Sequence, residues 1–304
     1  MSESGGVAVA APPPAQGARL ERSVFEPRAL KSLILTICVW GAAILAGLPL
    51  VSVLYMLIVR GGARLSTSLF TELPPAGFEM GGGFGNAIVG TVVMIAIAAV
   101  LSIPFGILAA VFLAELGPES RLAQATRFAT KTLTGMPSIL AGVFAYAVVV
   151  LTLGTYSAPA GGLALAVLML PTVVLTAESA IGTVPKITRD AAYGMGCTRS
   201  QVIWKVMLPT AMSGILTGVM LAVARAAGET APLLFTALFS SYWPVSGGVP
   251  HLMQPTASLA VLIYNFSGMP FENQIELAWA ASLVLVLLVL TINILSRWIG
   301  QRRV

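Results

Sequence analysis

The sequence has 304 residues, of which 57% are hydrophobic and only 10% are charged, and its mean hydropathy is +0.91. A water-soluble globular domain has about half apolar and about a quarter charged residues, so this composition excludes one and predicts a protein that crosses a membrane several times. The formal net charge of +5 does not require nucleic acid as a partner, because basic residues near the ends of membrane helices contact anionic lipid.

The first 30 residues are rich in Ala, Pro, Gly and Ser. Such a segment has too little apolar surface to form a core, so residues 1–30 are predicted to be a disordered cytoplasmic segment. The apolar run that follows, residues 32–59, is longer than the apolar part of a signal peptide. We therefore expect it to remain in the protein as a membrane helix, and residues 31–304 to form one membrane domain.

Apolar stretches of helical length predict the membrane spans, since about 20 helical residues cross a hydrocarbon core of about 30 Å. They are residues 32–59, 87–113, 133–153, 162–177, 211–227 and 277–295. The fifth contains Arg225 and is followed by Glu229, and we count it as a span because ionisable residues at membrane depth are usually functional. The predicted class is an all-α membrane protein with six transmembrane helices.

The basic residues predict the orientation. With the amino terminus in the cytoplasm, 14 of the 17 Lys and Arg residues fall on cytoplasmic segments: Arg19, Arg22, Arg28, Lys31, Arg121, Arg127, Lys131, Lys186, Arg189, Arg199, Lys205, Arg297, Arg302 and Arg303. The outer loops hold only Arg60 and Arg64. This asymmetry follows the positive-inside rule, so both termini of the multi-pass chain are expected in the cytoplasm.

Two outer loops are long, residues 61–86 and 238–276. The second is rich in aromatic residues: Tyr242, Trp243, Tyr264, Phe266 and Phe271. Aromatic rings there serve either as anchors at the membrane surface or as a surface for a partner, and the sequence leaves both open.

A polar, charged segment interrupts the apolar chain at residues 181–210. Pro185 can start a short helix, because its missing N–H is among those left unpaired at a helix start, and two glycines then end it. Thr198 and Gln201 have the spacing of a capping box, which starts a second helix. That helix is expected to end at Leu208-Pro209, where the chain re-enters the membrane. The two helices and their turn make a cytoplasmic knob that suits a groove on another protein.

The residue order in this knob resembles the EAA motif of the permease subunits of ATP-driven importers, EAA-x3-G-x9-I-x-L-P. The matching residues are Asp190, Ala191, Ala192, Gly196, Leu208 and Pro209. Asp stands for Glu at the first position and Val206 for Ile, and the spacing is retained throughout. The resemblance implies the type I ABC importer (MetI-like) permease fold, with a coupling helix that sits in a cleft of the ATP-hydrolysing subunit. A loop whose helices only pack on the bundle is the alternative.

Arg225 and Glu229 are four residues apart, so they share one helix face if the helix continues through Gly228. An ionisable residue at membrane depth costs about 2.5–3.5 kcal/mol on insertion scales, so the pair is expected to face protein or a water-filled path. A guanidinium suits phosphate or another oxyanion, and Glu229 would moderate the positive charge so that the anion can leave. A mutually neutralising pair that holds helices together is the alternative.

Three runs are similar to the A-type permeases of the phosphate-specific transport (Pst) importers: ARAAGETAPLLFTAL from Ala224, NAIVGT from Asn86 and LTGMPSILAGVF from Leu133. The resemblance extends from about Gly83 to the end, and it implies that Arg225 and Glu229 take part in phosphate passage. Weaker candidates for the substrate pathway are Thr230, Asn86, Thr134 and Ser138. Helix capping or packing is the alternative role for each of these four.

The resemblance also implies a location in the bacterial plasma (inner) membrane and a set of partners. These are phosphate, membrane lipid, a C-type permease in a heterodimer, two ATPase subunits, and a phosphate-binding protein that is periplasmic or lipid-anchored. The chain has no Gly-x4-Gly-Lys-Ser/Thr loop, so ATP-Mg is expected in the partner ATPase subunit and no cofactor or enzymatic activity in this chain. Its two cysteines and one histidine have no metal-ligand spacing, so neither metal ligands nor catalytic residues are predicted.

Two rival functions share part of this pattern. A sulfate or molybdate importer would carry the EAA motif without the run around Arg225. An ion-driven secondary carrier would need no cytoplasmic knob, so loss of residues 190–196 would leave its transport intact.

Overall fold

The computed structural model describes residues 27–246 and 249–301. The chain divides into two units, residues 1–54 and 55–304. The first unit holds most of α1 (Pro27–Met56), a 30-residue helix whose side chains are exposed over nearly its whole length. A helix that is apolar all round suits contact with lipid. It begins four residues before the boundary expected at residue 31, and the disorder predicted for residues 1–30 falls on 1–26, outside the described residues.

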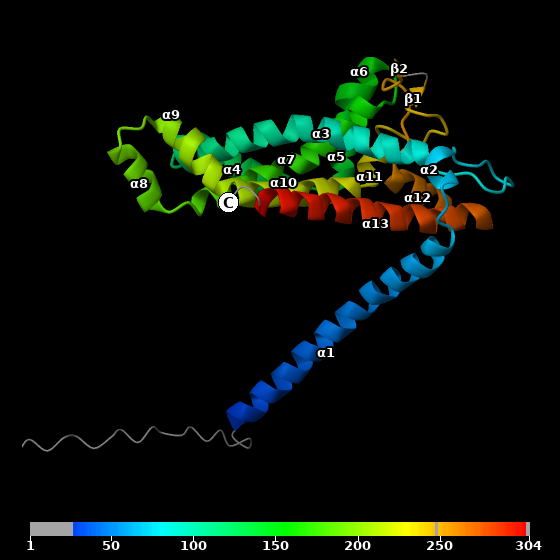
Figure 1. Ribbon diagram of the computed structural model, residues 1–304, viewed down its shortest axis with the longest axis horizontal. Helices are drawn as coiled ribbons and strands as arrows, with labels where there is room; N and C mark the ends of the chain where they lie inside the picture. The colour runs from blue at the N-terminus through cyan, green and yellow to red at the C-terminus, as the bar shows by residue number, and fades with distance from the viewer. Residues whose placement is uncertain (1–26, 247–248, 302–304) are drawn as a thin grey trace, which may run out of the picture. The chain divides into compact units, whose positions relative to one another are not determined.

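The second unit is helical apart from one short antiparallel ladder in the part that the structure describes (Figure 1). Its elements in chain order are η1 (Leu57–Gly61), α2 (Ser68–Thr71), α3 (Gly85–Val111), η2 (Phe112–Leu116), α4 (Arg121–Thr134), α5 (Ser138–Ala145), η3 (Tyr146–Val150), α6 (Leu151–Leu153), α7 (Ala158–Gly182), α8 (Lys186–Gly194), α9 (Arg199–Gln201), η4 (Val202–Met207), α10 (Leu208–Ala227), α11 (Ala231–Leu234), β1 (Val245–Ser246), β2 (Val249–Pro250), α12 (Leu259–Ser267) and α13 (Glu272–Gln301). The four segments labelled η are π-helical turns, which are wider than the α-helix.

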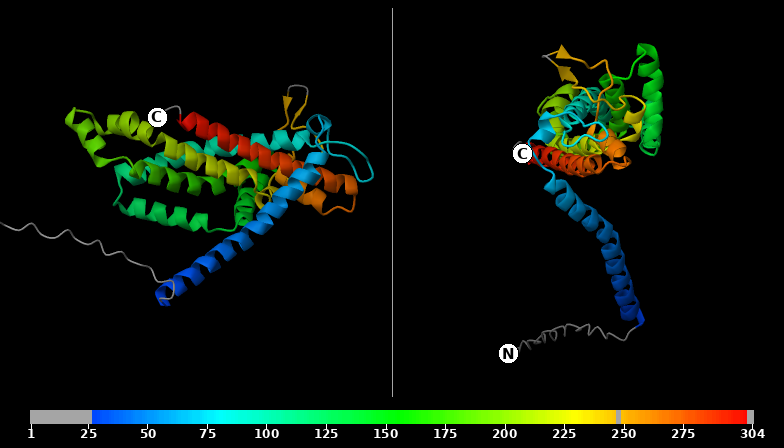
Figure 2. Two further views of the ribbon diagram at one scale, coloured as in Figure 1. Left: turned by 60° about the horizontal axis from the view of Figure 1, so that its bottom comes forward. Right: turned by 90° about the vertical axis from the view of Figure 1, so that its right-hand side faces the viewer.

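Helices α3, α7, α10 and α13 run alongside one another and form the body of this unit (Figures 1 and 2). Met94 of α3 and Met169 of α7 are buried at its centre. Glycine allows α7 and α10 to approach closely, since a Cβ on Gly218 would lie 2.1 Å from the Thr176 hydroxyl oxygen. Membrane helices depend on such close packing because lipid is as apolar as their side chains.

The predicted spans are largely confirmed. Five helices among the described residues are long and apolar enough to cross a membrane: Leu30–Gly61, Gly85–Leu116, Ala158–Gly182, Arg199–Ala227 and Glu272–Leu295. The remaining predicted span, residues 133–153, falls on a bent pair of helices, Arg121–Thr134 and Ser138–Leu153, which meet at 106° and together can form a sixth span. Pro137 has no N–H and disfavours helical geometry in the residue before it, which breaks the helix at this point.

The prediction that the second helix of the knob ends at Leu208-Pro209 was wrong. The helix continues from α9 through η4 into α10 without a break, as residues Arg199–Ala227. A proline inside an α-helix clashes with the carbonyl four residues earlier, here that of Lys205. The π-helical turn over Val202–Met207 includes Lys205, and its wider geometry lets the helix continue past the proline.

The predicted outer loop 238–276 contains a buried helix that was not predicted from the sequence. Helix α12 is nine residues long, too short to appear as a span, and Leu259, Val261 and Leu262 within it are buried. Its first N–H, from Leu259, donates to the hydroxyl of Thr91 on α3 at 2.9 Å. The loop is therefore part of the core at this end of the unit, which we call the α12 end.

Candidate translocation and coupling sites

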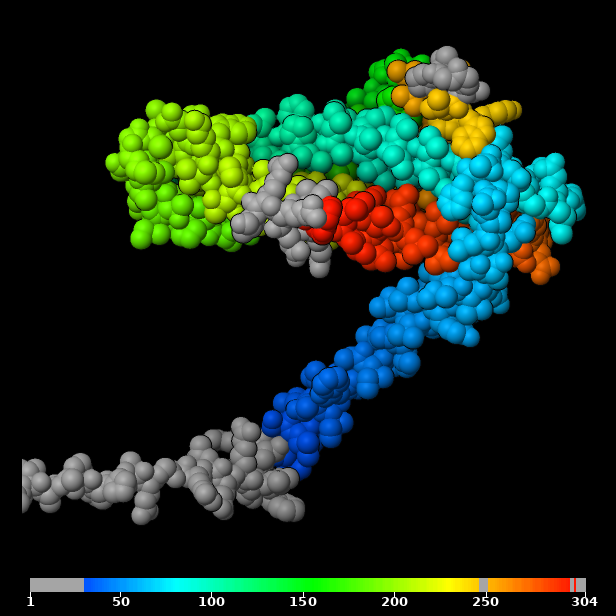
Figure 3. All heavy atoms as spheres, in the orientation of Figure 1, coloured from blue at the N-terminus to red at the C-terminus, as the bar shows by residue number. Residues whose placement is uncertain are grey.

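The knob lies at the opposite end of the unit from α12, and we call this the α8 end (Figure 1). In the space-filling view it projects past the end of α3 (Figure 3). Pro185 lies at the N-cap of α8, and Gly196 has φ +84°, a left-handed conformation that favours glycine. The predicted capping box is confirmed, with Thr198 accepting from the Gln201 N–H and Gln201 accepting from the Thr198 N–H. Local sequence signals therefore build the knob as expected.

The motif residues divide into buried and open ones. Ala192 and Leu208 are buried in the main core cluster, and Gly196 forms the turn. Asp190, Ala191 and Pro209 are exposed. The knob also exposes large apolar side chains, of which Ile187 at 77% and Met195 at 78% are the most exposed. Exposed apolar side chains at the end of a bundle, beside polar ones, are typical of a surface that contacts a partner.

An arginine of the knob is held by the end of another helix. The Nη1 of Arg189 pairs with the Glu115 carboxylate of η2, and its Nη2 donates to the carbonyls of Ile181 and Val184, both at 3.2 Å. Arg199, at the start of the second knob helix, donates to the backbone carbonyl of Glu115. Both knob helices are thus tied to the segment that follows α3.

A second arginine holds the same segment from the other side. Arg127 of α4 pairs through Nε with Glu178 of α7 at 2.6 Å, and its two terminal nitrogens donate to the carbonyls of Pro118 and Leu113 at 2.7 Å each. In the sequence, Arg127 and Arg189 indicated only the orientation of the chain, and Glu115 and Glu178 were not predicted as their partners. The signal that could have identified these two glutamates is a carboxylate near the end of a span, on the side of the membrane that carries most of the Lys and Arg residues.

The Arg225–Glu229 pair forms as the spacing predicts, although α10 ends at Ala227, before Gly228. The Nε of Arg225 lies 3.7 Å from the Glu229 carboxylate. The glutamate side chain is 18% exposed and the arginine side chain is 46% exposed. The pair is close enough for charge attraction, and about half of the arginine side chain remains accessible.

The pair lies where a helix stops inside the unit. Helix α10 ends part way along α13, as both Figure 1 and Figure 2 show. The chain then continues through α11, and Leu233, Thr236 and Ala237 are buried. Non-helical backbone at membrane depth is tolerated where protein covers it or where it lines a water-filled cavity.

A second helix break lies near this one. Gly142 of α5 packs so tightly on α11 that a Cβ there would lie 2.6 Å from the Cα of Pro232. Ser138 is one helical turn before Gly142, and Thr230 is two residues before Pro232. The break between α4 and α5 is therefore brought close to the break between α10 and α11.

The weaker candidates differ in how accessible they are. Thr134 is exposed but its hydroxyl donates to the Thr130 carbonyl at 3.0 Å, and Ser138 is half-buried in the first turn of α5. Thr230 lies at the N-cap of α11 without a capping bond from its side chain. Asn86 is fully buried and its amide donates to the carbonyls of Ser240 and Tyr242, at 2.8 and 3.3 Å, so it fixes the outer loop and stands apart from the two breaks.

Comparison with known proteins identifies the family. Residues 102–304 match the model of the binding-protein-dependent transport system inner membrane component. The chain is 42% identical over 254 residues to the phosphate transport system permease protein PstA of Yersinia pestis, covering 84% of each chain. It is 39% identical over 273 residues to PstA of Pasteurella multocida, covering 90% of this chain and 95% of the relative.

The fold has a solved counterpart. A chain of the MetNI methionine ABC transporter, in an inward-facing conformation, aligns with a TM-score of 0.57 at 20% identity, over 72% of this chain and 93% of its own. This likeness confirms the predicted MetI-like fold. The chain belongs to the binding-protein-dependent transport system inner membrane components, and within that family it groups with the PstA permeases.

Proposed function

We propose that this chain is the transmembrane permease subunit of an ATP-driven phosphate importer and that Arg225 lies on the phosphate path. The relatives that cover most of the chain are phosphate transport system permeases. The observation that carries the proposal is the half-exposed side chain of Arg225 beside a helix break inside the bundle. A charge that faced lipid at this depth would cost several kcal/mol, so an open arginine suits a water-filled path.

The arrangement fits anion passage. An arginine offers up to five N–H donors in a planar fork that matches phosphate oxygens. Glu229 at 3.7 Å offsets part of its charge, which weakens the hold on the anion and allows release. Binding sites of membrane transporters form where helices are discontinuous, and here the break before Ser138 and the break before Thr230 come close together. Thr230, Thr134 and Ser138 are the polar groups available to complete such a path.

Energy for transport enters through the knob. We assign Asp190, Ala191, Ile187 and Met195 to the surface that contacts an ATPase subunit, because they are among the exposed residues of α8 and its turn. ATP and Mg²⁺ bind to two such subunits and not to this chain. The other partners are a C-type permease that completes the path, and a phosphate-binding protein at the α12 end.

The orientation follows the basic residues. The α8 end, with Lys186, Arg189, Arg199 and Lys205, faces the cytoplasm together with both termini, and the α12 end faces outward. The membrane is the plasma membrane of a bacterium.

Uptake of radiolabelled phosphate at low concentration tests the substrate. Cells that lack other high-affinity phosphate importers are compared with and without this chain, and with excess sulfate or molybdate. The proposal requires uptake that depends on the chain and ignores both competitors. Uptake blocked by sulfate would assign the subunit to another oxyanion, and uptake that survives removal of residues 190–196 would indicate a secondary carrier.

Two variants test the path. Arg225→Gln is expected to abolish uptake while the complex still assembles. Arg121→Gln removes an exposed arginine at the α8 end and is the matched control, which should transport normally. Loss of assembly in Arg225→Gln alone would show that the Arg225–Glu229 pair serves to hold helices together.

A further inference from the structure

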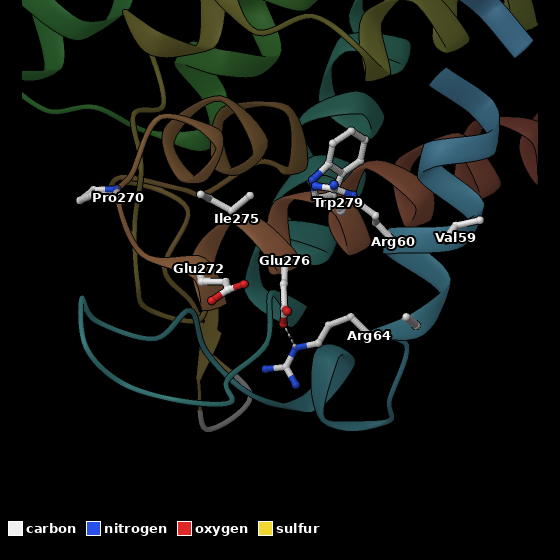
Figure 4. A pocket seen from close by; sticks show the side chains of 9 residues that line it. Val59, Arg60, Arg64, Pro270, Glu272, Ile275, Glu276 and Trp279 are labelled. Atoms are coloured by element: carbon white, nitrogen blue, oxygen red, sulfur yellow. Dashed lines mark ion pairs between the residues drawn. The ribbon is translucent and has the colours of Figure 1, made fainter. Parts of the chain in front are cut away.

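A cavity lined by both charged and apolar side chains lies at the α12 end (Figure 4). It has a volume of about 730 Å³ and is formed between η1 and the first turns of α13. Its charged residues are Arg60 and Arg64 on one side and Glu272 and Glu276 on the other, so their formal charges cancel. The volume is within the range of about 300–1,000 Å³ that is usual for small-ligand sites.

Within the described residues, half of this charge is paired and half is not. Arg64 donates to the side chain of Asn273 at 2.7 Å, and its Nε lies 3.6 Å from the Glu276 carboxylate. Arg60 lies over the ring of Trp279, 5.7 Å from its centre, and forms no ion pair with a carboxylate. The Glu272 side chain forms neither a hydrogen bond nor an ion pair there. The cavity thus keeps one spare cation and one spare carboxylate.

The cavity lies where two apolar helices begin or end. Arg60 is the last residue but one of the span Leu30–Gly61, and Glu272 is the first residue of the span Glu272–Leu295. Val59 and Ile275 provide apolar walls, and Trp279 has the position of an aromatic residue at a membrane surface. This depth is where phospholipid headgroups lie.

We infer that this cavity binds the headgroup of a zwitterionic phospholipid that carries a primary ammonium, the phosphoethanolamine class. Its phosphate accepts hydrogen bonds from Arg60, and its ammonium donates to Glu272 and to the open oxygens of Glu276. A quaternary ammonium has no N–H to donate, and the face of Trp279 that would attract it is already covered by Arg60. An anionic headgroup would leave Glu272 unpaired beside a negative charge.

Lipid retention by the purified, fully assembled complex tests this inference, and native mass spectrometry gives the readout. The probes are phosphatidylethanolamine, phosphatidylcholine and phosphatidylglycerol with identical acyl chains, each with and without excess inorganic phosphate. We expect phosphatidylethanolamine to be retained about fivefold better than phosphatidylcholine. Glu272→Gln should remove this preference while phosphatidylglycerol retention is maintained. Arg60→Gln should lower the retention of both phosphatidylethanolamine and phosphatidylglycerol.

Matched controls separate this site from general charge effects. Glu119→Gln and Arg121→Gln remove one exposed charge of each sign at the α8 end and should leave retention unchanged. Three outcomes in the unmodified, assembled complex would overturn the inference: equal retention of phosphatidylcholine, preference for phosphatidylglycerol, or no retained lipid. None of them depends on whether a variant folds. Displacement of the lipid by inorganic phosphate would instead identify free phosphate as the ligand. The lipid measurement does not depend on transport, so it remains informative if the proposed substrate is wrong.

Discussion

Loss of the Arg189–Glu115 pair should release the knob from the end of α3. The two side chains are 20% and 14% exposed, and Arg189 also holds the carbonyls of Ile181 and Val184. A hydrogen bond to a charged group contributes about 1.5–3 kcal/mol, and removal of one partner from a fully buried pair costs about 3–5 kcal/mol. Because this pair is mostly but not fully buried, Arg189→Gln should cost about 2 kcal/mol in local stability.

Hydrogen exchange measures that local stability directly. A loss of about 2 kcal/mol corresponds to about 25-fold faster exchange of protected amides in α8. In the double variant Arg189→Gln, Glu115→Gln, the loss of local stability should be about 1 kcal/mol smaller than the sum of the losses in the two single variants, since the effects of contacting residues are not additive. Lys186→Gln, on the same helix and exposed, is the control.

The functional consequence is a loss of coupling. If the knob contacts an ATPase subunit as proposed, ATP hydrolysis by the assembled complex should continue in Arg189→Gln. Phosphate uptake per ATP should fall, because movement of the knob would no longer be passed to α3. Hydrogen exchange in α8 that changes less than twofold would refute the idea that the Arg189–Glu115 pair holds the knob to the end of α3. So would single variants whose effects simply add.

Three further substitutions test packing and backbone geometry. Gly142→Ala places a methyl group 2.6 Å from the Pro232 backbone and should destabilise the unit by about 1–3 kcal/mol, read as a lower melting temperature, whereas Gly182→Ala meets nothing within 4 Å and should not. Asn86→Ala leaves the carbonyls of Ser240 and Tyr242 without their donor and should cost about 1–3 kcal/mol in the same assay; an unchanged melting temperature would show that water replaces it. Gly196→Ala has free space but φ +84°, so it should cost about 1–2 kcal/mol locally and speed exchange in the knob, and an equal effect of Gly194→Ala would argue against backbone strain as the cause.

The sequence by itself determined the features that depend on local information. Four of the five long spans follow from apolar length alone, because backbone hydrogen bonds inside lipid must be satisfied within each helix. The fifth, which holds Arg225, was counted because ionisable residues at membrane depth are usually functional. The caps and the turn of the knob follow from residues within a few positions of one another, as Thr198 and Gln201 demonstrate. The Arg225–Glu229 pair was predicted from its spacing for the same reason.

The tertiary structure decided what depends on distant residues. Proline predicts an interruption, but the same residue type breaks the chain by 106° at Pro137 and is passed by a π-helical turn before Pro209. Arg127 and Glu178 are 51 residues apart, and Arg189 and Glu115 are 74 apart, so no local pattern pairs them. Helix α12 is too short to be recognised as a span and becomes part of the core only because α3 and α13 cover it. Pairings of this kind depend on which helix faces meet in three dimensions, and the helical period of a single segment does not contain that information.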